Sequence, residues 1–208
     1  MKERVVLILV MLGGFVVSNA QVGAGFTVAN DLYNIYSNPE DVQDVHRKNG
    51  SALLNLGIGP KIWFGAKDFS FSVESLVNFS PLGLAIKDYK GLGAVSFPIM
   101  GKVNFKGLSG FNKDTGLGYS IGGGIQYNKT ELFGLKDSFE SQGVQRDFYR
   151  TYNVQAAVGV GLTGFSGYLY GRYGFNPDLD GARNFHIGLQ LDFNFSELKK
   201  IDKPESAL

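Results

Sequence analysis

The fold is decided near the C-terminus, by the segment NFHIGLQLDFNF at residues 184–195. Every second residue of this segment is apolar, and the residues between them are polar or glycine; the apolar ones are Phe185, Ile187, Leu189, Leu191, Phe193 and Phe195. Successive side chains of a strand point to opposite faces, so the segment predicts a strand with one apolar and one polar face. The same alternation recurs along most of the chain, which predicts an all-β fold.

The N-terminus has the features of a secretory signal. Lys2 and Arg4 form a basic start, residues 5–17 an apolar core, and residues 18–20 a small-residue cleavage site that ends at Ala20. Because the apolar run is shorter than the roughly 20 residues of a spanning helix, cleavage is favoured over a retained anchor. We therefore expect residues 1–20 to be a signal peptide, residues 21–195 a barrel and residues 196–208 a periplasmic tail.

Composition excludes several classes of function. The chain has no cysteine, so it forms no disulfide, thiolate metal site or lipid anchor on an N-terminal cysteine. Its net charge is +1, from 20 basic and 19 acidic residues, which gives no electrostatic case for a nucleic-acid partner. The 29 glycines among 208 residues exceed the roughly 7% typical of soluble domains.

The alternating segments have the length of membrane-crossing strands. About eight are predicted, at residues 22–30, 53–64, 69–79, 94–105, 117–129, 151–162, 165–175 and 184–195. Most have roughly 10–12 residues, which exceeds the usual 5–6 of a soluble strand and suits a tilted crossing. The connections alternate in length, with tight turns at Lys67-Asp68 and Thr163-Gly164 and long loops at residues 31–51 and 130–150. Short turns at one end and long loops at the other are typical of outer-membrane barrels.

Alternation alone does not say which face points outward, because a soluble lipocalin-like barrel alternates too, with its apolar face inside. The polar face here is mostly glycine, serine and asparagine. Glycine weakens a strand and is tolerated where another group approaches closely, which fits a crowded interior better than a face in water. We therefore predict a transmembrane antiparallel up-and-down β-barrel, with outer-membrane lipid against the apolar face.

Three short motifs resemble a known family. Residues 96–105, SFPIMGKVNF, are similar to the "IPLLLKY-F" strand of PorT-like outer-membrane barrels of Gram-negative bacteria, and residues 57–61, GIGPK, to their "GxGP" strand. Residues 186–193 resemble the C-terminal signal that the barrel-assembly machinery recognises. The resemblance implies a small porin-family-like barrel that this machinery assembles, but no single activity. The chain departs from the pattern because a polar tail follows Phe195.

The charged residues of the polar face form the nearest thing to a site. A two-residue turn at Lys67-Asp68 places Lys61 opposite Glu74, and the next register places Lys102 on the other flank of Glu74. Buried charges must be paired, so we expect a structural network in the lumen rather than an ion path or a ligand site. Its predicted members are Lys61, Glu74, Lys102, Arg172, His186 and Asp192.

No catalytic, cofactor or metal site is predicted. His46 lies near Asp41, Asp44 and Ser51 in the first long loop, and a lone loop histidine among common polar residues is more often solvated than catalytic. The run NPDLDG at residues 176–181 lacks the remaining ligands of a calcium loop and suits a turn. Three hypotheses stay open. The first is a non-enzymatic outer-membrane barrel with a structural, surface-interaction or secretion-accessory role, whose long external loops carry specificity for extracellular or periplasmic protein partners that the sequence does not name. The others are an outer-membrane lipid-modifying enzyme that uses His46 and a soluble lipocalin-like binder.

Overall fold

The chain forms one closed antiparallel β-barrel of eight strands. The computed structural model describes residues 20–39, 48–81, 93–112, 114–134 and 146–201. Its elements are β1 (Gln21–Ser37), β2 (Lys48–Ala52), β3 (Leu56–Ala66), β4 (Phe69–Ser75), β5 (Val77–Ser80), β6 (Ala94–Lys106), β7 (Gly116–Thr130), β8 (Tyr149–Leu162), β9 (Phe165–Phe175), β10 (Arg183–Asn194) and α3 (Phe195–Ile201). The segments β2 and β3 both pair with β1, and β4 and β5 both lie between β3 and β6, so each of these pairs counts as one interrupted strand.

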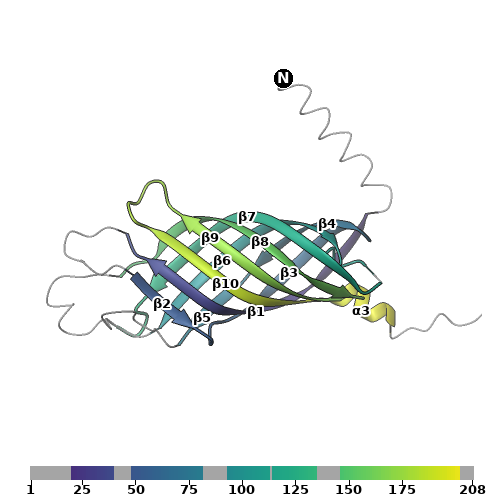
Figure 1. Cartoon of the computed structure of the whole chain (residues 1–208), viewed down its shortest axis with the longest axis horizontal. Helices are drawn as coiled ribbons and strands as arrows, with labels where there is room; N and C mark the ends of the chain where they lie inside the picture. The colour runs from purple at the N-terminus through teal and green to yellow at the C-terminus, as the bar shows by residue number, and fades with distance from the viewer. Residues whose placement is uncertain (1–19, 40–47, 82–92, 113, 135–145, 202–208) are drawn as a thin grey trace, which may run out of the picture.

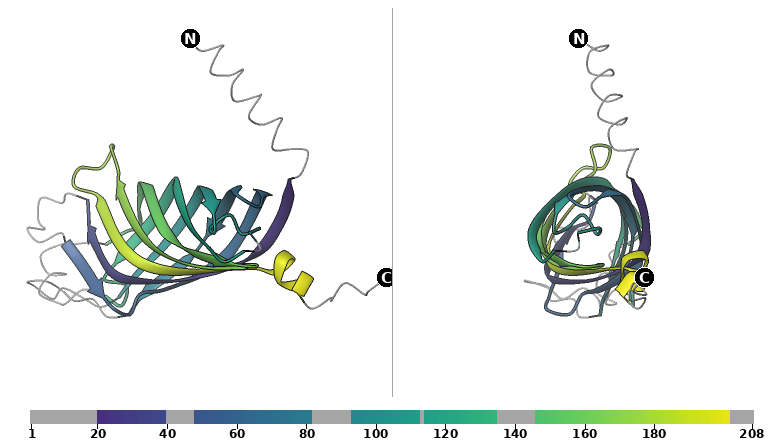
Figure 2. Two further views of the ribbon diagram at one scale, coloured as in Figure 1. Left: turned by 45° about the vertical axis from the view of Figure 1, so that its right-hand side comes forward. Right: turned by 90° about the vertical axis from the view of Figure 1, so that its right-hand side faces the viewer.

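The barrel is an up-and-down barrel, as the alternation predicted. Each strand pairs antiparallel with its neighbour in the chain, and β10 returns to pair with β1, where Val28 lies opposite Leu191. Figures 1 and 2 show the strands tilted around one axis, with the helix α3 at the end where the turns are short. Because the sheet closes on itself, no long edge of unpaired backbone groups remains.

Burial confirms the predicted direction of the two faces. The apolar side chains that alternate along β7 are exposed on the outer wall, where Ile121 is 61% accessible, whereas Gln126 on the other face is fully buried. Polar residues such as Thr27, Asn104 and Asn128 fill the inside of the barrel. A lipocalin-like interior would require the opposite arrangement.

The predicted loop at residues 31–51 is partly wrong, because β1 continues to Ser37 and β2 begins at Lys48. The pairing of β1 with β10 shifts by one residue between Asp31 and Tyr33, which marks a β-bulge at Leu32. A bulge inserts one extra residue and therefore breaks the alternation along the sequence. Asp31 and Asn34 therefore both point inward although they are three residues apart. Because this spacing does not fit a period of two, the segment resembles a polar loop in the sequence.

A second irregularity separates β4 from β5 at Leu76. The residue opposite on β6 is Pro98, which has no N–H to donate to the ladder. Leu76 still donates its own N–H to the Pro98 carbonyl at 3.0 Å. The register on both sides is the same, with Ser75 opposite Ile99 and Asn78 opposite Ser96, so the strand continues through the break.

The connection between β6 and β7 folds back into the short-turn end of the barrel. Leu108, Ser109 and Phe111 of this connection are buried. In the end-on view of Figure 2 the teal connection lies within the ring of strands. Its backbone passes close to β7, since a Cβ added to Gly118 would lie 2.3 Å from the Leu108 nitrogen. We call residues 107–112 the inward connection.

The helix α3 starts the segment that the sequence predicted as a tail from Ser196. The Asn194 side chain caps it, because Oδ1 accepts the N–H of Ser196 at 3.1 Å. Ser196 in turn accepts the N–H of Ala24 on β1 through its hydroxyl, at 3.3 Å. The last strand therefore passes directly into a helix held against the barrel end. Residues 1–19, which include almost the whole predicted signal peptide, and residues 202–208 lie outside the described residues.

Two glycines of β7 make a matched pair for testing the inward connection. At Gly118 an alanine would meet the backbone of residues 105–108, whereas at Gly116 the nearest atom is 3.9 Å from the added Cβ. We expect Gly118→Ala to lower the free energy of unfolding by about 1–3 kcal/mol, as overpacking does, and Gly116→Ala to change it by less than about 0.5 kcal/mol. Equilibrium unfolding followed by the fluorescence of Trp63, the only tryptophan, measures both. Equal stability of the two variants would contradict the packing described.

Candidate functional site

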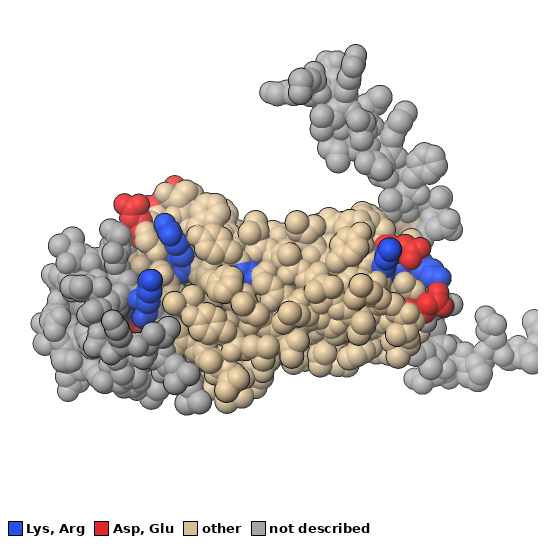
Figure 3. All heavy atoms as spheres, viewed as in Figure 1, with Lys and Arg blue, Asp and Glu red and all other residues tan. Residues whose placement is uncertain are grey.

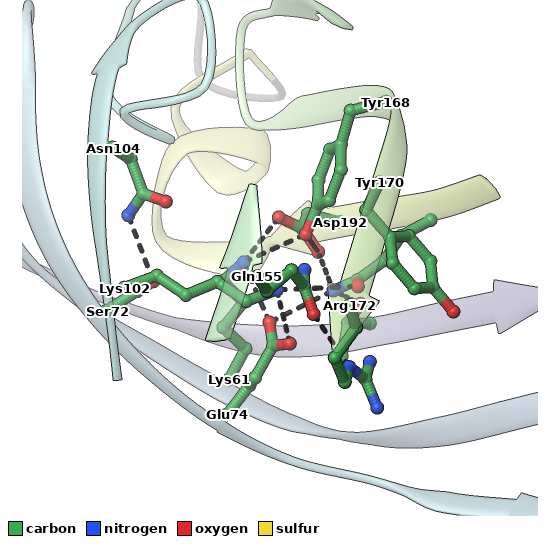
Figure 4. Close-up of polar contacts among 12 residues, drawn as sticks. Lys61, Ser72, Glu74, Lys102, Asn104, Gln155, Tyr168, Tyr170, Arg172 and Asp192 are labelled. Carbon is green, nitrogen blue, oxygen red and sulfur yellow. Dashed lines mark hydrogen bonds and ion pairs between the residues drawn. The ribbon is translucent and has the colours of Figure 1, made fainter. Parts of the chain in front are cut away.

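The candidate site is the lumen, where the strands place six charged residues on the inside of the barrel. Three are basic and three acidic: Lys61, Lys102 and Arg172, with Asp31, Glu74 and Asp192, all nearly or fully buried. Their formal charges cancel. Figure 4, which labels all of these residues except Asp31, shows the side chains coming from different strands and meeting in the interior of the barrel.

A first cluster, which we call the lysine–carboxylate chain, alternates charges across the lumen. Lys102 Nζ lies 2.5 Å from Glu74 Oε1, and Lys61 Nζ lies 3.0 Å from Glu74 Oε2. Lys61 continues to Asp192, with Nζ 2.7 Å from Oδ2. The cross-strand pairing places Lys61 directly opposite Glu74, as the two-residue turn requires. The chain thus joins β3, β4, β6 and β10 through ion pairs.

Neutral groups complete the hydrogen bonds of this chain. Gln190 donates through Nε2 to Glu74 at 3.0 Å, to Asp192 at 3.2 Å and to the Thr27 hydroxyl at 2.6 Å. The Tyr168 hydroxyl accepts from Lys61 at 3.2 Å and donates to Asp192 at 3.2 Å. Hydrogen bonds to ionised groups are stronger than neutral ones, so these contacts offset part of the cost of burying the charges.

A second cluster lies nearer the long-loop end and centres on Asp31 and Arg172. The Asp31 carboxylate contacts His186, with Oδ2 2.7 Å from Nδ1, and accepts the Tyr170 hydroxyl. Arg172 donates to Gln155 Oε1 and to Gln126 Oε1, each at 2.9 Å. In the described part of the chain, Arg172 Nη2 has no hydrogen-bond partner.

The hydrogen bonds fix the tautomer of His186. Gln126 turns its oxygen to Arg172, so its amide nitrogen faces His186 Nε2 at 3.3 Å. An amide nitrogen only donates, so Nε2 accepts and the ring proton sits on Nδ1, directed to Asp31. His186 thus links Asp31 and Gln126, with both ring nitrogens engaged.

All six predicted lumen residues face inward, but the structure divides them between the two clusters. Lys61, Glu74, Lys102 and Asp192 belong to the lysine–carboxylate chain, and Arg172 and His186 to the second cluster. Asp31 was not among the predicted members of the network, because the bulge at Leu32 made its segment resemble a loop. Nor were Gln126 and Gln155, whose inward position follows from the alternation in β7 and β8.

The inward connection covers the short-turn end of the lumen. A Cβ added to Gly110 would lie 2.9 Å from the Trp63 ring, so the connection passes directly over the buried indole. Asn194 of β10 donates through Nδ2 to the Gly110 carbonyl at 3.0 Å, and Ser109 donates its hydroxyl to the Lys67 carbonyl at 2.5 Å. These bonds attach the connection to β10 and to the turn between β3 and β4.

The charged pair outside the barrel at this end behaves as an exposed ion pair. Lys67 Nζ lies 2.6 Å from Asp114 Oδ2, with both side chains more than half accessible. Hydrogen bonding to Asp114 raises the pKa of Lys67, and the same bond lowers the pKa of Asp114. Solvent screening keeps such exposed pairs weak.

The structure offers no second site of another kind among its described residues. No group of His, Asp and Glu side chains there has the arrangement of a metal site. No helix of the described segments is long and apolar enough to cross a membrane. His46, the residue on which the enzyme hypothesis rests, lies outside the described residues. Residues 176–181 form a turn, in which Asn176 Oδ1 accepts the Asp178 N–H at 2.8 Å.

A hollow of about 400 Å³ lies on the apolar wall of β8, β9 and β10. Ala156 and Gly171 are neighbours there, and larger residues such as Val158, Leu169 and Ile187 surround them. A Cβ added to Gly171 would meet nothing within 4 Å. The hollow offers apolar surface without a nucleophile or a charged group, so it suits contact with hydrocarbon rather than catalysis.

Comparison with known proteins finds likeness in solved structures only. No protein-family model matches the sequence, and neither does any curated protein, so the PorT-like resemblance stays a prediction. Neisserial surface protein A is similar with a TM-score of 0.46 and 11% identity, over 85% of this chain and 99% of that chain. The N-terminal β-barrel domain of Pseudomonas aeruginosa OprF gives 0.43 and 11%, over 83% and 99%, and Ail of Yersinia pestis 0.43 and 11%, over 84% and 99%. With TM-scores below 0.5 and 11% identity, these likenesses carry no argument about this chain.

Glu74 is the residue whose loss should damage the lumen most, because it neutralises two lysines. Glu74→Gln keeps the shape of the side chain and leaves Lys102 without a carboxylate partner. Breaking a buried ion pair is expected to lower the free energy of unfolding by about 3–5 kcal/mol. The matched control is Lys67→Gln, which breaks the exposed pair and should cost less than about 1 kcal/mol. Denaturant titration of the purified protein measures both; a Glu74→Gln protein as stable as the control would exclude a stabilising network.

Proposed function

We propose that the protein is an integral outer-membrane barrel with a plugged polar lumen, and that it is not an enzyme. Its role is structural, or lies in surface interaction or in assistance to secretion, through the long loops at one end. The single observation that carries this proposal is the inverted burial of the barrel: charged and polar residues inside, a continuous apolar wall outside. A soluble protein rarely exposes an apolar surface of this extent, whereas a membrane requires it.

The aromatic residues support a membrane setting. Near the short-turn end, Phe69, Phe105 and Tyr119 pack side by side on the outer wall, with ring centroids 5.5 and 4.9 Å apart. Near the long-loop end, the rings of Tyr173 and Phe175 stack 6.4 Å apart. Between these levels, aliphatic residues such as Ile121 and Leu189 dominate the wall. Two aromatic girdles that flank an aliphatic band are typical of outer-membrane barrels.

The lumen supports a scaffold rather than a channel. Eight strands enclose a space that side chains about fill. Ion pairs of the lysine–carboxylate chain cross this space at one level, and the inward connection lies across the short-turn end. We therefore place specificity outside the lumen, in the long loops, since loops on a rigid scaffold commonly carry binding. Residues 40–47, 82–92 and 135–145 of these loops lie outside the described residues.

Two outward positions of β7 test the membrane setting. Ile121 and Leu117 are similarly accessible, at 61% and 66%, but Leu117 is one residue from the strand end and Ile121 lies deeper. In a bilayer, Ile121→Lys should lower the free energy of unfolding by about 2–4 kcal/mol and Leu117→Lys by about 0–1 kcal/mol. Unfolding titrations in lipid vesicles measure the difference. In a soluble barrel both lysines would be harmless, and that result would overturn the proposal.

Fractionation tests the location directly. We expect the mature protein in the outer-membrane fraction, resistant to carbonate extraction, with a folded band that shifts in gel migration only after boiling. A protein released by carbonate, with equal migration before and after boiling, would exclude the membrane barrel. The same fractions show by mass spectrometry whether the mature chain begins at Gln21.

Planar lipid bilayers test the plugged lumen. We expect no discrete conductance from the wild-type protein, because side chains and the inward connection close the path for ions. A porin of 16 strands, which has an aqueous channel, serves as the positive control in the same membranes. Steady single-channel currents from the wild-type protein would overturn the plugged lumen and leave the membrane setting intact.

A further inference from the structure

The charges on the outer wall are distributed unlike those of the lumen. Four charged residues near the long-loop ends of the strands point outward, and all four are basic: Lys48, Lys129, Arg150 and Arg183. A fifth exposed base, Lys106, ends β6 at the short-turn end. The direction of the first four follows from their neighbours: the residues flanking Lys129 and Arg150 are buried in the lumen, and Lys48 and Arg183 both pair with the outward Ser37. No acidic residue of the strands faces outward.

These four residues, the basic rim, all lie at the long-loop end. Lys48 begins β2, Lys129 is the next-to-last residue of β7, Arg150 the second of β8 and Arg183 the first of β10. Figure 3 shows the charged side chains of one face gathered at its two ends, with a broad band almost free of charge between them. At the short-turn end, by contrast, the charges of Lys67 and Asp114 lie in turns and neutralise each other.

Among the described residues, the basic rim has few ion-pair partners. Lys48, Lys129 and Arg183 form no ion pair with any residue that the structure describes, whereas each lumen lysine contacts a carboxylate at 3.0 Å or less. Arg150 reaches only the exposed Asp178, at 4.0 Å. The acidic residues described at this end, Glu131, Asp147, Asp178 and Asp180, belong to connections beyond the strand ends, and Glu131 forms an ion pair with Arg146 at 3.0 Å.

Two members of the rim are joined to the aromatic girdle. The Arg150 guanidinium lies 4.8 Å from the centroid of the Tyr152 ring, and Lys129 Nζ lies 5.5 Å from that of Phe148. Lys129 and Arg150 are diagonal neighbours on β7 and β8, and Lys48 and Arg183 are separated by one strand, or about 10 Å. The cations therefore sit at the depth where the apolar wall ends and lipid headgroups begin.

We infer that the basic rim binds the phosphate groups of an anionic glycolipid of the outer leaflet, a diphosphorylated lipid of the lipid A type. The inference rests on the proposed function, because the long-loop end of an outer-membrane barrel faces outward. Arginine and lysine are the side chains that bind phosphate, and the sign of all four charges complements it. A need for interfacial anchors alone would place cations evenly at both ends; the strands described at the short-turn end carry one exposed base, Lys106, against four outward bases at the long-loop end.

The test compares four-fold neutralisation of the rim with neutralisation of bases at the other end. The rim variant carries Lys48→Gln, Lys129→Gln, Arg150→Gln and Arg183→Gln; the control carries Lys67→Gln and Lys106→Gln, both exposed bases of the short-turn end. Each full-length protein, folded in a zwitterionic detergent, is titrated with diphosphorylated lipid A, and bound lipid is counted by native mass spectrometry. We expect the rim variant to bind about tenfold or more weakly than the wild type, and the control to bind like the wild type.

Two further ligands identify the occupant. The wild type should bind dephosphorylated lipid A with an affinity no higher than that of the rim variant for diphosphorylated lipid A. It should also bind phosphatidylglycerol with a much lower affinity than diphosphorylated lipid A. The inference would be overturned if the rim variant bound diphosphorylated lipid A as tightly as the wild type does, or if the control lost as much affinity as the rim variant. It would also be overturned if the wild type bound phosphatidylglycerol as tightly as diphosphorylated lipid A. The folded band of every variant in a gel is scored separately. A wild type that never shows heat-modifiable migration therefore contradicts the membrane barrel, whereas a folded rim variant with unchanged lipid binding contradicts only the rim.

Discussion

Closure of the sheet between β1 and β10 is the constraint on which the rest of the structure depends. Once Val28 pairs with Leu191, every strand has a neighbour on both sides and the backbone polar groups of the wall are satisfied within the protein. Closure also makes the same face of every strand point into one common interior, so the alternation along each strand separates a lumen from an outer wall. The apolar wall and the polar lumen both follow from this one geometric event.

The closed interior explains why the lumen charges balance. A charge removed from water is costly unless an opposite charge lies beside it, and the lumen offers six charged side chains of which three are basic and three acidic. Glu74 accommodates two lysines because Asp192 shares one of them. Replacement of such a network by apolar residues is often neutral for stability, so we regard it as a device that fixes which strands face one another across the barrel.

The two ends of the barrel follow different rules. At the short-turn end the inward connection, Asn194 and the capped helix α3 hold one another, and the exposed charges cancel. At the long-loop end the wall carries four cations, of which only Arg150 has an ion-pair partner among the described residues, Asp178 at 4.0 Å. If the barrel spans a membrane as proposed, this asymmetry reflects the different surroundings of its two ends, and it is the reason to seek the protein's interactions at the loop end rather than in the lumen.

The sequence by itself determined the elements and their two faces. Alternation with a period of two is a local property, so the strand from 165 to 175 and its neighbours could be placed, and the turn at Lys67-Asp68 set Lys61 against Glu74. The prediction from the sequence was wrong around Leu32. The bulge there adds one residue and interrupts the alternation, so Asp31 resembled a loop residue. Only the tertiary structure showed that Asp192 of the last strand contacts Lys61, that the inward connection packs over Trp63, and that four cations lie at one rim. These features depend on closure of the barrel, because closure places residues that are far apart in the chain next to one another.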